Sequence, residues 1–206
     1  MRVLFFLILL LNLQSCTTKK YTKTRLLPEG IKSGTEETYE VVNNQKKLLQ
    51  KKQMVFTGNG RIKYSKTFDA TGNLLQETQK KLWFVVESYP DREPYYCKTR
   101  WKPNQRERIS CYTKKQYKQN EGIYHYNTDG TIDKIMDNFT TFRTQYFYYT
   151  NKELSKIVTR DKNDNLVDEV LVRCETKDEK GACVKEIRIS TKTNNKEEIL
   201  FSPKYD

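Results

Sequence analysis

The most reactive side chains in this 206-residue chain are its five cysteines, since a thiol can be acylated, oxidised or bound to a metal. Cys16 closes an apolar N-terminal run, and the other four are Cys97, Cys111, Cys174 and Cys183. An even number of cysteines in an exported chain predicts disulfides. Four cysteines allow three pairings, and zinc binding is the competing use.

Turn-forming residues favour the local pairing, Cys97–Cys111 with Cys174–Cys183. Lys-Pro-Asn-Gln lies inside the first interval and Lys-Asp-Glu-Lys-Gly inside the second, as expected of two hairpins. A zinc site is disfavoured, because the spacings are not CxxC pairs and export favours oxidation.

The first predicted hairpin separates charge by face. If Cys97 lies opposite Cys111, Thr99 faces Ile109 and Trp101 faces Glu107. The alternate positions then form one basic face, which we expect to meet an anionic partner: Lys98, Arg100, Lys102, Arg106 and Arg108. A solvated surface that only keeps the protein soluble is the alternative interpretation.

No catalytic set is expected elsewhere. His125 is the single histidine, so neither a Ser-His-Asp triad nor a histidine-rich metal site can be built. Carboxylate pairs at 161/164, 168/169 and 178/179 lie beside turn residues and are predicted to be solvated. The segment 161–165 is superficially similar to a calcium loop but lacks the glycine and terminal glutamate of an EF-hand. We therefore expect no enzyme, cofactor or metal.

Charge is distributed unevenly along the chain. Residues 17–120 contain 23 basic and 10 acidic side chains, a net of +13, whereas residues 121–206 contain 14 and 16, a net of −2. This asymmetry indicates a surface for anionic partners, for which we consider anionic lipid, lipopolysaccharide, glycan and acidic protein.

The first sixteen residues have the pattern of an export signal. Arg2 precedes an apolar run at 3–11, which is too short to span a bilayer as a helix. The following Leu-Gln-Ser-Cys, ending at Cys16, resembles the lipobox of bacterial lipoproteins. That resemblance implies lipidation of Cys16, a membrane anchor and a place in the cell envelope, with the outer membrane favoured. Nucleic acid is then excluded as a partner of the basic face.

The remaining sequence predicts an all-β protein. A signal peptide at 1–15 and a flexible lipidated tether at 16–37 precede a single domain at 38–206. Short alternating runs rich in Tyr and Thr are separated by turn residues, and no stretch has a helical period. We predict an antiparallel meander of hairpins, curled or stacked into a sheet or partial barrel. Two boundaries matter below, because strands are predicted at 38–43 and 74–88.

Several hairpins share a sequence pattern. FDATGNL (68–74) and YNTDGTI (126–132) have a common aromatic, Gly and aliphatic spacing, and FTGNGRI (56–62), YYTNKEL (148–154) and RDKNDNL (160–166) fit more loosely. The pattern resembles the YD repeats of RHS-type proteins. Hairpins that share a turn type would also produce it, so both interpretations are kept.

Two functions follow from these observations. The first is a membrane-anchored structural or interaction lipoprotein that binds anionic envelope components through the basic face. The second is a carrier or binding protein for a hydrophobic ligand, such as a lipid, held in the curled sheet.

Overall fold

The computed structural model describes residues 27–58, 60–102 and 106–205, and all regular structure in these ranges is β-strand. The all-β prediction is therefore confirmed. The strands are β1 (Ile31–Val42), β2 (Gln45–Phe56), β3 (Ile62–Asp69), β4 (Leu74–Lys80), β5 (Val85–Tyr89), β6 (Arg92–Lys102), β7 (Arg106–Tyr112), β8 (Lys118–Tyr126), β9 (Ile132–Asp137), β10 (Thr144–Thr150), β11 (Glu153–Arg160), β12 (Leu166–Lys177), β13 (Cys183–Ser190) and β14 (Lys196–Tyr205).

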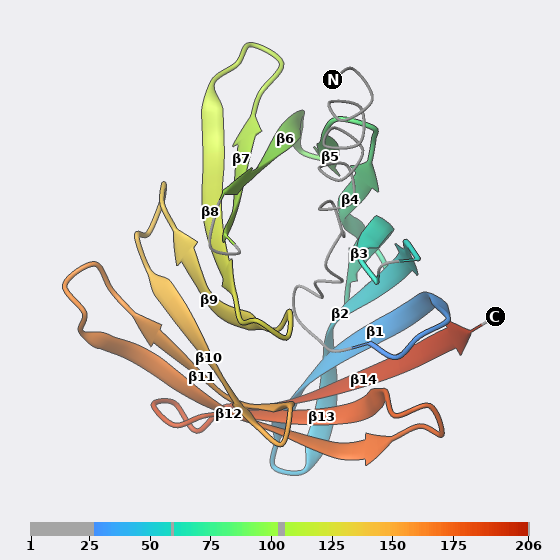
Figure 1. Cartoon of the computed structure of the whole chain (residues 1–206). Helices are drawn as coiled ribbons and strands as arrows, with labels where there is room; N and C mark the ends of the chain where they lie inside the picture. The colour runs from blue at the N-terminus through green and yellow to red at the C-terminus, as the bar shows by residue number, and fades with distance from the viewer. Residues whose placement is uncertain (1–26, 59, 103–105, 206) are drawn as a thin grey trace, which may run out of the picture.

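The strands form a closed antiparallel barrel in which each strand pairs with the next along the chain. In Figure 1 the colours run in order around the sheet, from blue β1 to red β14, and these two strands lie side by side. Their ladder closes the barrel and pairs Thr38 with Ile199. Closure leaves no strand edge unpaired, which removes the aggregation hazard of a long meander.

Several predicted boundaries are wrong, among them that of the strand predicted at 139–149, which begins at Thr144. The strand predicted at 38–43 begins at Ile31, so residues 31–37 of the predicted tether belong to β1. They are held there because β1 pairs with β2 on one side and β14 on the other, which local sequence cannot indicate. The run 74–88 is two strands, β4 and β5, separated by a tight turn at 81–84.

Many of the hairpins share one turn. The N–H of the first turn residue donates to the carbonyl four residues on, and the fourth residue has positive φ, as at Asp69 with Gly72 and at Asp161 with Asp164. The aspartate carboxylate also accepts N–H bonds from within the turn. The same turn occurs in FTGNGRI and YNTDGTI, whereas YYTNKEL turns through two positive-φ residues, Asn151 and Lys152. A common turn thus accounts for most of the repeated pattern, and kinship with YD repeats stays a prediction.

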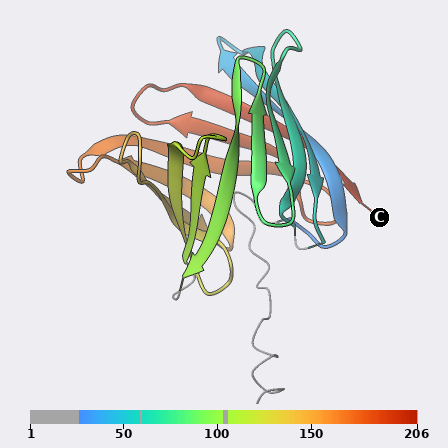
Figure 2. The same ribbon diagram turned by 90° about the horizontal axis from the view of Figure 1, so that it is seen from above.

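The turns divide into two rims. Ile31 pairs with Tyr205, so the chain enters β1 and leaves β14 at one end of the barrel. The turns after even-numbered strands lie at this end, which we call the tether rim, and the turns after odd-numbered strands form the opposite rim. Figure 2 shows the barrel from a second side, with the C-terminus at the tether rim.

Two apolar clusters fill the interior near the tether rim. Phe201 packs with Ile31, Met54 and Phe56 where β14, β1 and β2 meet, and Tyr126 packs with Ile132 between β8 and β9. No helix in the described part of the chain has the length and apolarity needed to cross a bilayer. Cys16 lies outside the described residues, so its lipidation stays a prediction.

Candidate functional site

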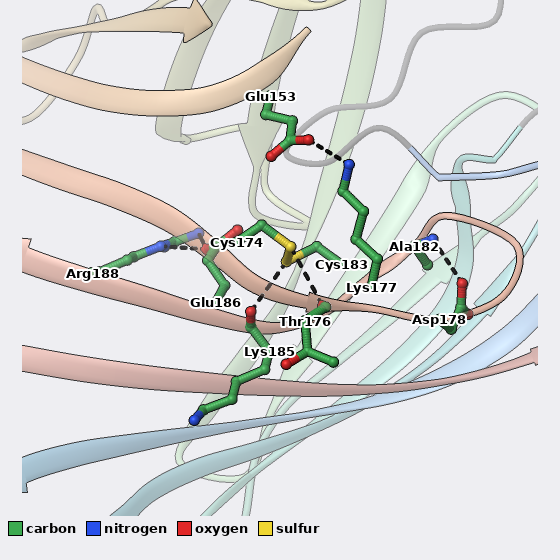
Figure 3. The surroundings of a disulfide bond; sticks show 10 residues. All are labelled: Glu153, Cys174, Thr176, Lys177, Asp178, Ala182, Cys183, Lys185, Glu186 and Arg188. Atoms are coloured by element: carbon green, nitrogen blue, oxygen red, sulfur yellow. Dashed lines mark hydrogen bonds and ion pairs between the residues drawn. A yellow bond between two sulfur atoms is a disulfide. The ribbon is translucent and has the colours of Figure 1, made fainter. Parts of the chain in front are cut away.

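Both predicted disulfides are present. Cys97 pairs with Cys111 across β6 and β7, with a Cα–Cα distance of 3.9 Å, and Thr99 opposes Ile109 in the predicted register. Cys174 and Cys183 join β12 to β13 (Figure 3). Glu87 lies close to the first pair of sulfurs, but oxidised sulfurs cannot act as thiolate ligands.

An ion pair and a turn hydrogen bond lie near the second disulfide. The Lys177 ammonium forms an ion pair with Glu153 of β11, and the backbone N–H of Ala182 donates to Asp178 within the β12–β13 turn (Figure 3). These contacts fix the hairpin that closes next to the C-terminal strand.

The predicted basic face lies on the outside of the barrel, because the alternate residues Cys97, Cys111 and Glu107 are buried within it. Arg100 pairs directly with Arg108 in the ladder, and Lys102 pairs with Arg106. Directly opposed like charges destabilise a sheet. The like charges of this face therefore oppose the pairing of β6 with β7.

The basic face extends beyond the residues named from sequence. Arg106 pairs with His125 of β8, and His125 pairs with Lys134 of β9, so the row crosses four strands. Burial, followed by the charges of Lys134 and Arg106, lowers the pKa of His125, while Asp133 opposes the shift. The pKa of His125 therefore responds to the positive charges around it.

Arg108 lies inside this face with an incomplete set of contacts. Its Nε is buried and has no hydrogen-bond partner among the described residues. A buried donor without an acceptor costs about 1–3 kcal/mol.

The one acid of the basic hairpin serves a different purpose. Glu107 is fully buried and accepts hydrogen bonds from Arg61 Nη2 at 3.2 Å and from the Tyr126 hydroxyl at 2.6 Å. Arg61 comes from the β2–β3 turn, so this contact crosses the barrel interior. The network lies inside the barrel near the tether rim, and no local sequence pattern indicates it.

A cavity of about 590 Å³ opens into the lumen between β8 and β12. One ladder row of inward residues lines it, in the order Tyr124, Ile135, Gln145, Thr159 and Asp168. Because consecutive partners in a ladder point to the same side of the sheet, this row forms a continuous wall. The volume is in the range of small-molecule sites.

The mouth of the cavity is polar and lies at the opposite rim. Asn120, Asp137, Thr140 and Arg143 line it, the last three from β9 and the loop after it. Burial opposes ionisation of Asp137, but hydrogen bonds from Thr141 and from backbone N–H groups of the loop outweigh it and lower its pKa to about 2. Asp137 is therefore a carboxylate at neutral pH.

The ladder row next to the cavity lining is apolar. In the next ladder row toward the tether rim, Phe147 pairs with Ile157, which pairs with Val170. Burial, followed by the charges of Glu107 and Glu87, raises the pKa of Tyr124 to about 12, so the cavity lining includes a neutral phenol. The lumen can thus accommodate a polar group above an apolar one.

The predicted carboxylate pairs do not converge on a site. Asp168 lines the cavity, whereas its neighbour Glu169 lies on the outer face beside Lys156. Asp161 holds its own turn together, and Asp178 does the same at the β12–β13 turn. The cavity was not predicted from the sequence, because its lining comes from five strands that share no motif. The one local indication of it is the polar Asp-Asn-Phe-Thr-Thr run at 137–141.

Comparisons with known proteins do not assign the chain to a family. No family model matches it, and no curated protein matches it. Three solved structures are similar in part. A porin-like protein from Bacteroides uniformis has 10% identity and a TM-score of 0.39 over 80% of this chain, which covers 57% of that protein.

The other two cover most of both chains. A DUF1329 family protein from Desulfovibrio piger has 12% identity and a TM-score of 0.35, with coverage of 85% of this chain and 86% of that one. A LolA superfamily protein from Nitrosomonas europaea has 8% identity and a TM-score of 0.40, with coverage of 89% and 88%. Likenesses of this size assign neither family nor function to the chain.

Proposed function

We propose that this protein is a lipid-anchored binding protein of the bacterial cell envelope, which holds an amphipathic ligand in the lumen of its barrel. The observation that carries the proposal is the cavity of about 590 Å³, beside which the next ladder row toward the tether rim is apolar. The ligand's polar group would lie near Asp137 and Arg143, and its apolar part against Ile157 and Val170.

The experiment compares two neighbouring residues of β12 that point to opposite sides of the sheet. Val170 lies in the apolar lumenal row, and Leu171 is 47% exposed on the outer face. Val170→Glu would place a charge in the lumen, whereas Leu171→Glu is the matched outer control. Binding of a dansyl-labelled fatty acid is followed by fluorescence, and thermal unfolding is recorded for both variants.

We expect Val170→Glu to abolish binding and Leu171→Glu to leave it unchanged. Val170→Trp, which fills the lumen without adding charge, should also weaken binding if it folds normally. Equal binding by all three variants would contradict a lumenal site. Mass spectrometry of an organic extract of the purified protein identifies any ligand carried from the cell.

A second candidate function is the binding of an anionic envelope partner through the outer basic face. The directly opposed like charges of Arg100 and Arg108 on the outer face favour it. Reversal to Glu of Arg100, Lys102, Arg106 and Arg108 should abolish co-sedimentation with phosphatidylglycerol vesicles. Binding that is unchanged and insensitive to salt would contradict this role.

The control for this reversal keeps the same change in net charge. It reverses four exposed lysines from other parts of the surface, namely Lys47, Lys162, Lys192 and Lys204. His125 gives an independent readout, because the chain has one histidine. Anion binding should raise the pKa of His125 measured by NMR, since it compensates the charges of Arg106 and Lys134.

A further inference from the structure

The β4–β5 turn displays the two most exposed large apolar side chains of the described residues. Leu82 is 84% and Trp83 is 82% exposed. The Lys81 N–H donates to the Phe84 carbonyl at 2.8 Å, so Leu82 and Trp83 are the two central residues of a tight turn. Gly, Asn and Asp are normally preferred at such positions. Exposure of two large apolar side chains to water is unfavourable, so these residues are unusual at the tip.

The base of this turn is fixed. The Phe84 ring packs edge-on against Tyr96 of β6, with ring centroids 5.8 Å apart. Lys80 and Lys81 flank the tip and are exposed. A rigid tip with a tryptophan, a leucine and adjacent lysines has the composition found at the interface between a membrane and water.

The tip lies beside the basic face. Val85, just after the turn, pairs with Cys97, so the tip extends along the part of β6 that holds Lys98 and Arg100. Both belong to the tether-rim end of the barrel. The described turns of this rim contain three acids: Asp129 in the next turn, after β8, and Asp178 and Glu179 after β12.

We propose that the tether rim docks on an anionic phospholipid bilayer. Leu82 and Trp83 insert among the headgroups, while Lys80, Lys81 and the outer basic face lie against the lipid phosphates. Charge complementarity selects this occupant, since each lysine or arginine near an anionic leaflet contributes about 1 kcal/mol. The proposal goes beyond ligand binding in the lumen, and it rests on the proposed Cys16 anchor only for the path of the chain from the membrane to Ile31.

Docking in this orientation gives the two rims different surroundings. The Phe201 cluster and the Glu107–Arg61 contact lie inside the barrel near the tether rim. The mouth of the cavity, at Asp137 and Arg143, then faces away from the bilayer. A ligand would enter from the aqueous side.

The opposite rim provides the control, because it too exposes aromatic and basic residues. Tyr117 is 67% exposed, and Lys114 and Lys115 precede it in the β7–β8 turn. The two rims differ because the chain enters β1 and leaves β14 at the tether rim.

The experiment measures which rim reaches the acyl chains. Trp83 and Trp101 are the two tryptophans, so Trp101→Phe leaves Trp83 as the sole reporter. The matched control adds Trp83→Phe and Tyr117→Trp, which moves the reporter to the opposite rim. The full chain is mixed with equimolar phosphatidylglycerol and phosphatidylcholine vesicles that have brominated acyl chains, and flotation shows separately whether it is anchored.

We expect the Trp83 emission to shift to shorter wavelength and to be quenched, and the reporter at position 117 to remain bright. Lys80→Glu with Lys81→Glu should remove the quenching of Trp83. A bright Trp83, or equal quenching of both reporters, would overturn the proposal. Protein that lacks acyl chains should still give the Trp83 quenching with added vesicles, so a failure of the Cys16 anchor is distinguished from a failure of the docking surface.

Discussion

Asp137 illustrates how one side chain shapes the cavity mouth. Its carboxylate accepts backbone N–H bonds from Phe139, Thr140 and Thr141, and the Thr141 hydroxyl donates to it as well. The loop is thereby held in a shape that local propensity disfavours, since Phe142 has a φ of 53°. A single carboxylate thus fixes the conformation of the β9–β10 loop at the mouth of the cavity.

The pH dependence of stability should report this carboxylate. Its folded pKa of about 2 lies below the unfolded value of about 4, so its contribution is present above pH 4 and is lost as the pH falls toward 2. Asp137→Asn should cost about 1 kcal/mol at pH 7, since solvent screens the shift. It should also flatten the decline in stability between these pH values.

Chemical denaturation at a series of pH values measures this effect. Glu179→Gln, at an exposed turn position with no hydrogen bond among the described contacts, serves as the control and should leave the curve unchanged. An Asp137→Asn curve parallel to that of the native protein would contradict the assignment.

At the scale of elements, the hairpins were the most predictable part of the chain. The pairing of Cys97 with Cys111 and the outward basic face both followed from a period of two and a turn between the cysteines. The main errors were strand ends, at 31–37, at 81–84 and at the start of β10. In each case the deciding interaction was with another strand or with a turn of atypical residues, and neither leaves a local pattern.

The two disulfides should differ in their accessibility to a reductant. Cys97 and Cys111 are 1% and 4% exposed, whereas Cys174 and Cys183 are half-buried. Under native conditions dithiothreitol should therefore reduce Cys174–Cys183 first. Timed alkylation followed by peptide mapping measures the order, and earlier labelling of Cys97 would contradict the expectation.

Removal of the buried disulfide should have a large effect on stability. Cys97→Ala with Cys111→Ala opens a loop of 14 residues, which corresponds to about 3 kcal/mol of loop-closure free energy. The effect is measured in the same unfolding experiment as the native protein under oxidising conditions.

For the whole molecule, closure depends on a close approach between its first and last strands. A Cβ at Gly34 would lie 2.5 Å from Cε2 of Phe201, whose side chain is 2% exposed. Gly34→Ala should therefore destabilise the barrel by about 1–3 kcal/mol, because the ring has no space into which to move.

A double-mutant cycle tests whether this contact limits closure. Phe201→Leu removes the ring atoms nearest to position 34, so Gly34→Ala should cost less in that background, with a coupling of about 1 kcal/mol. Strictly additive free energies of unfolding would show that Phe201 is not the obstacle.

The sequence by itself determined the class of fold, the hairpins, the disulfide pairs and the separation of charge on β6 and β7. These features depend on neighbours within about twenty residues, so alternation and turn chemistry specify them. Only the tertiary structure decided the closure between β1 and β14, the Glu107–Arg61 contact and the cavity. The cavity joins inward residues of five strands, and which inward residues meet depends on ladder register and barrel curvature, which no local pattern encodes.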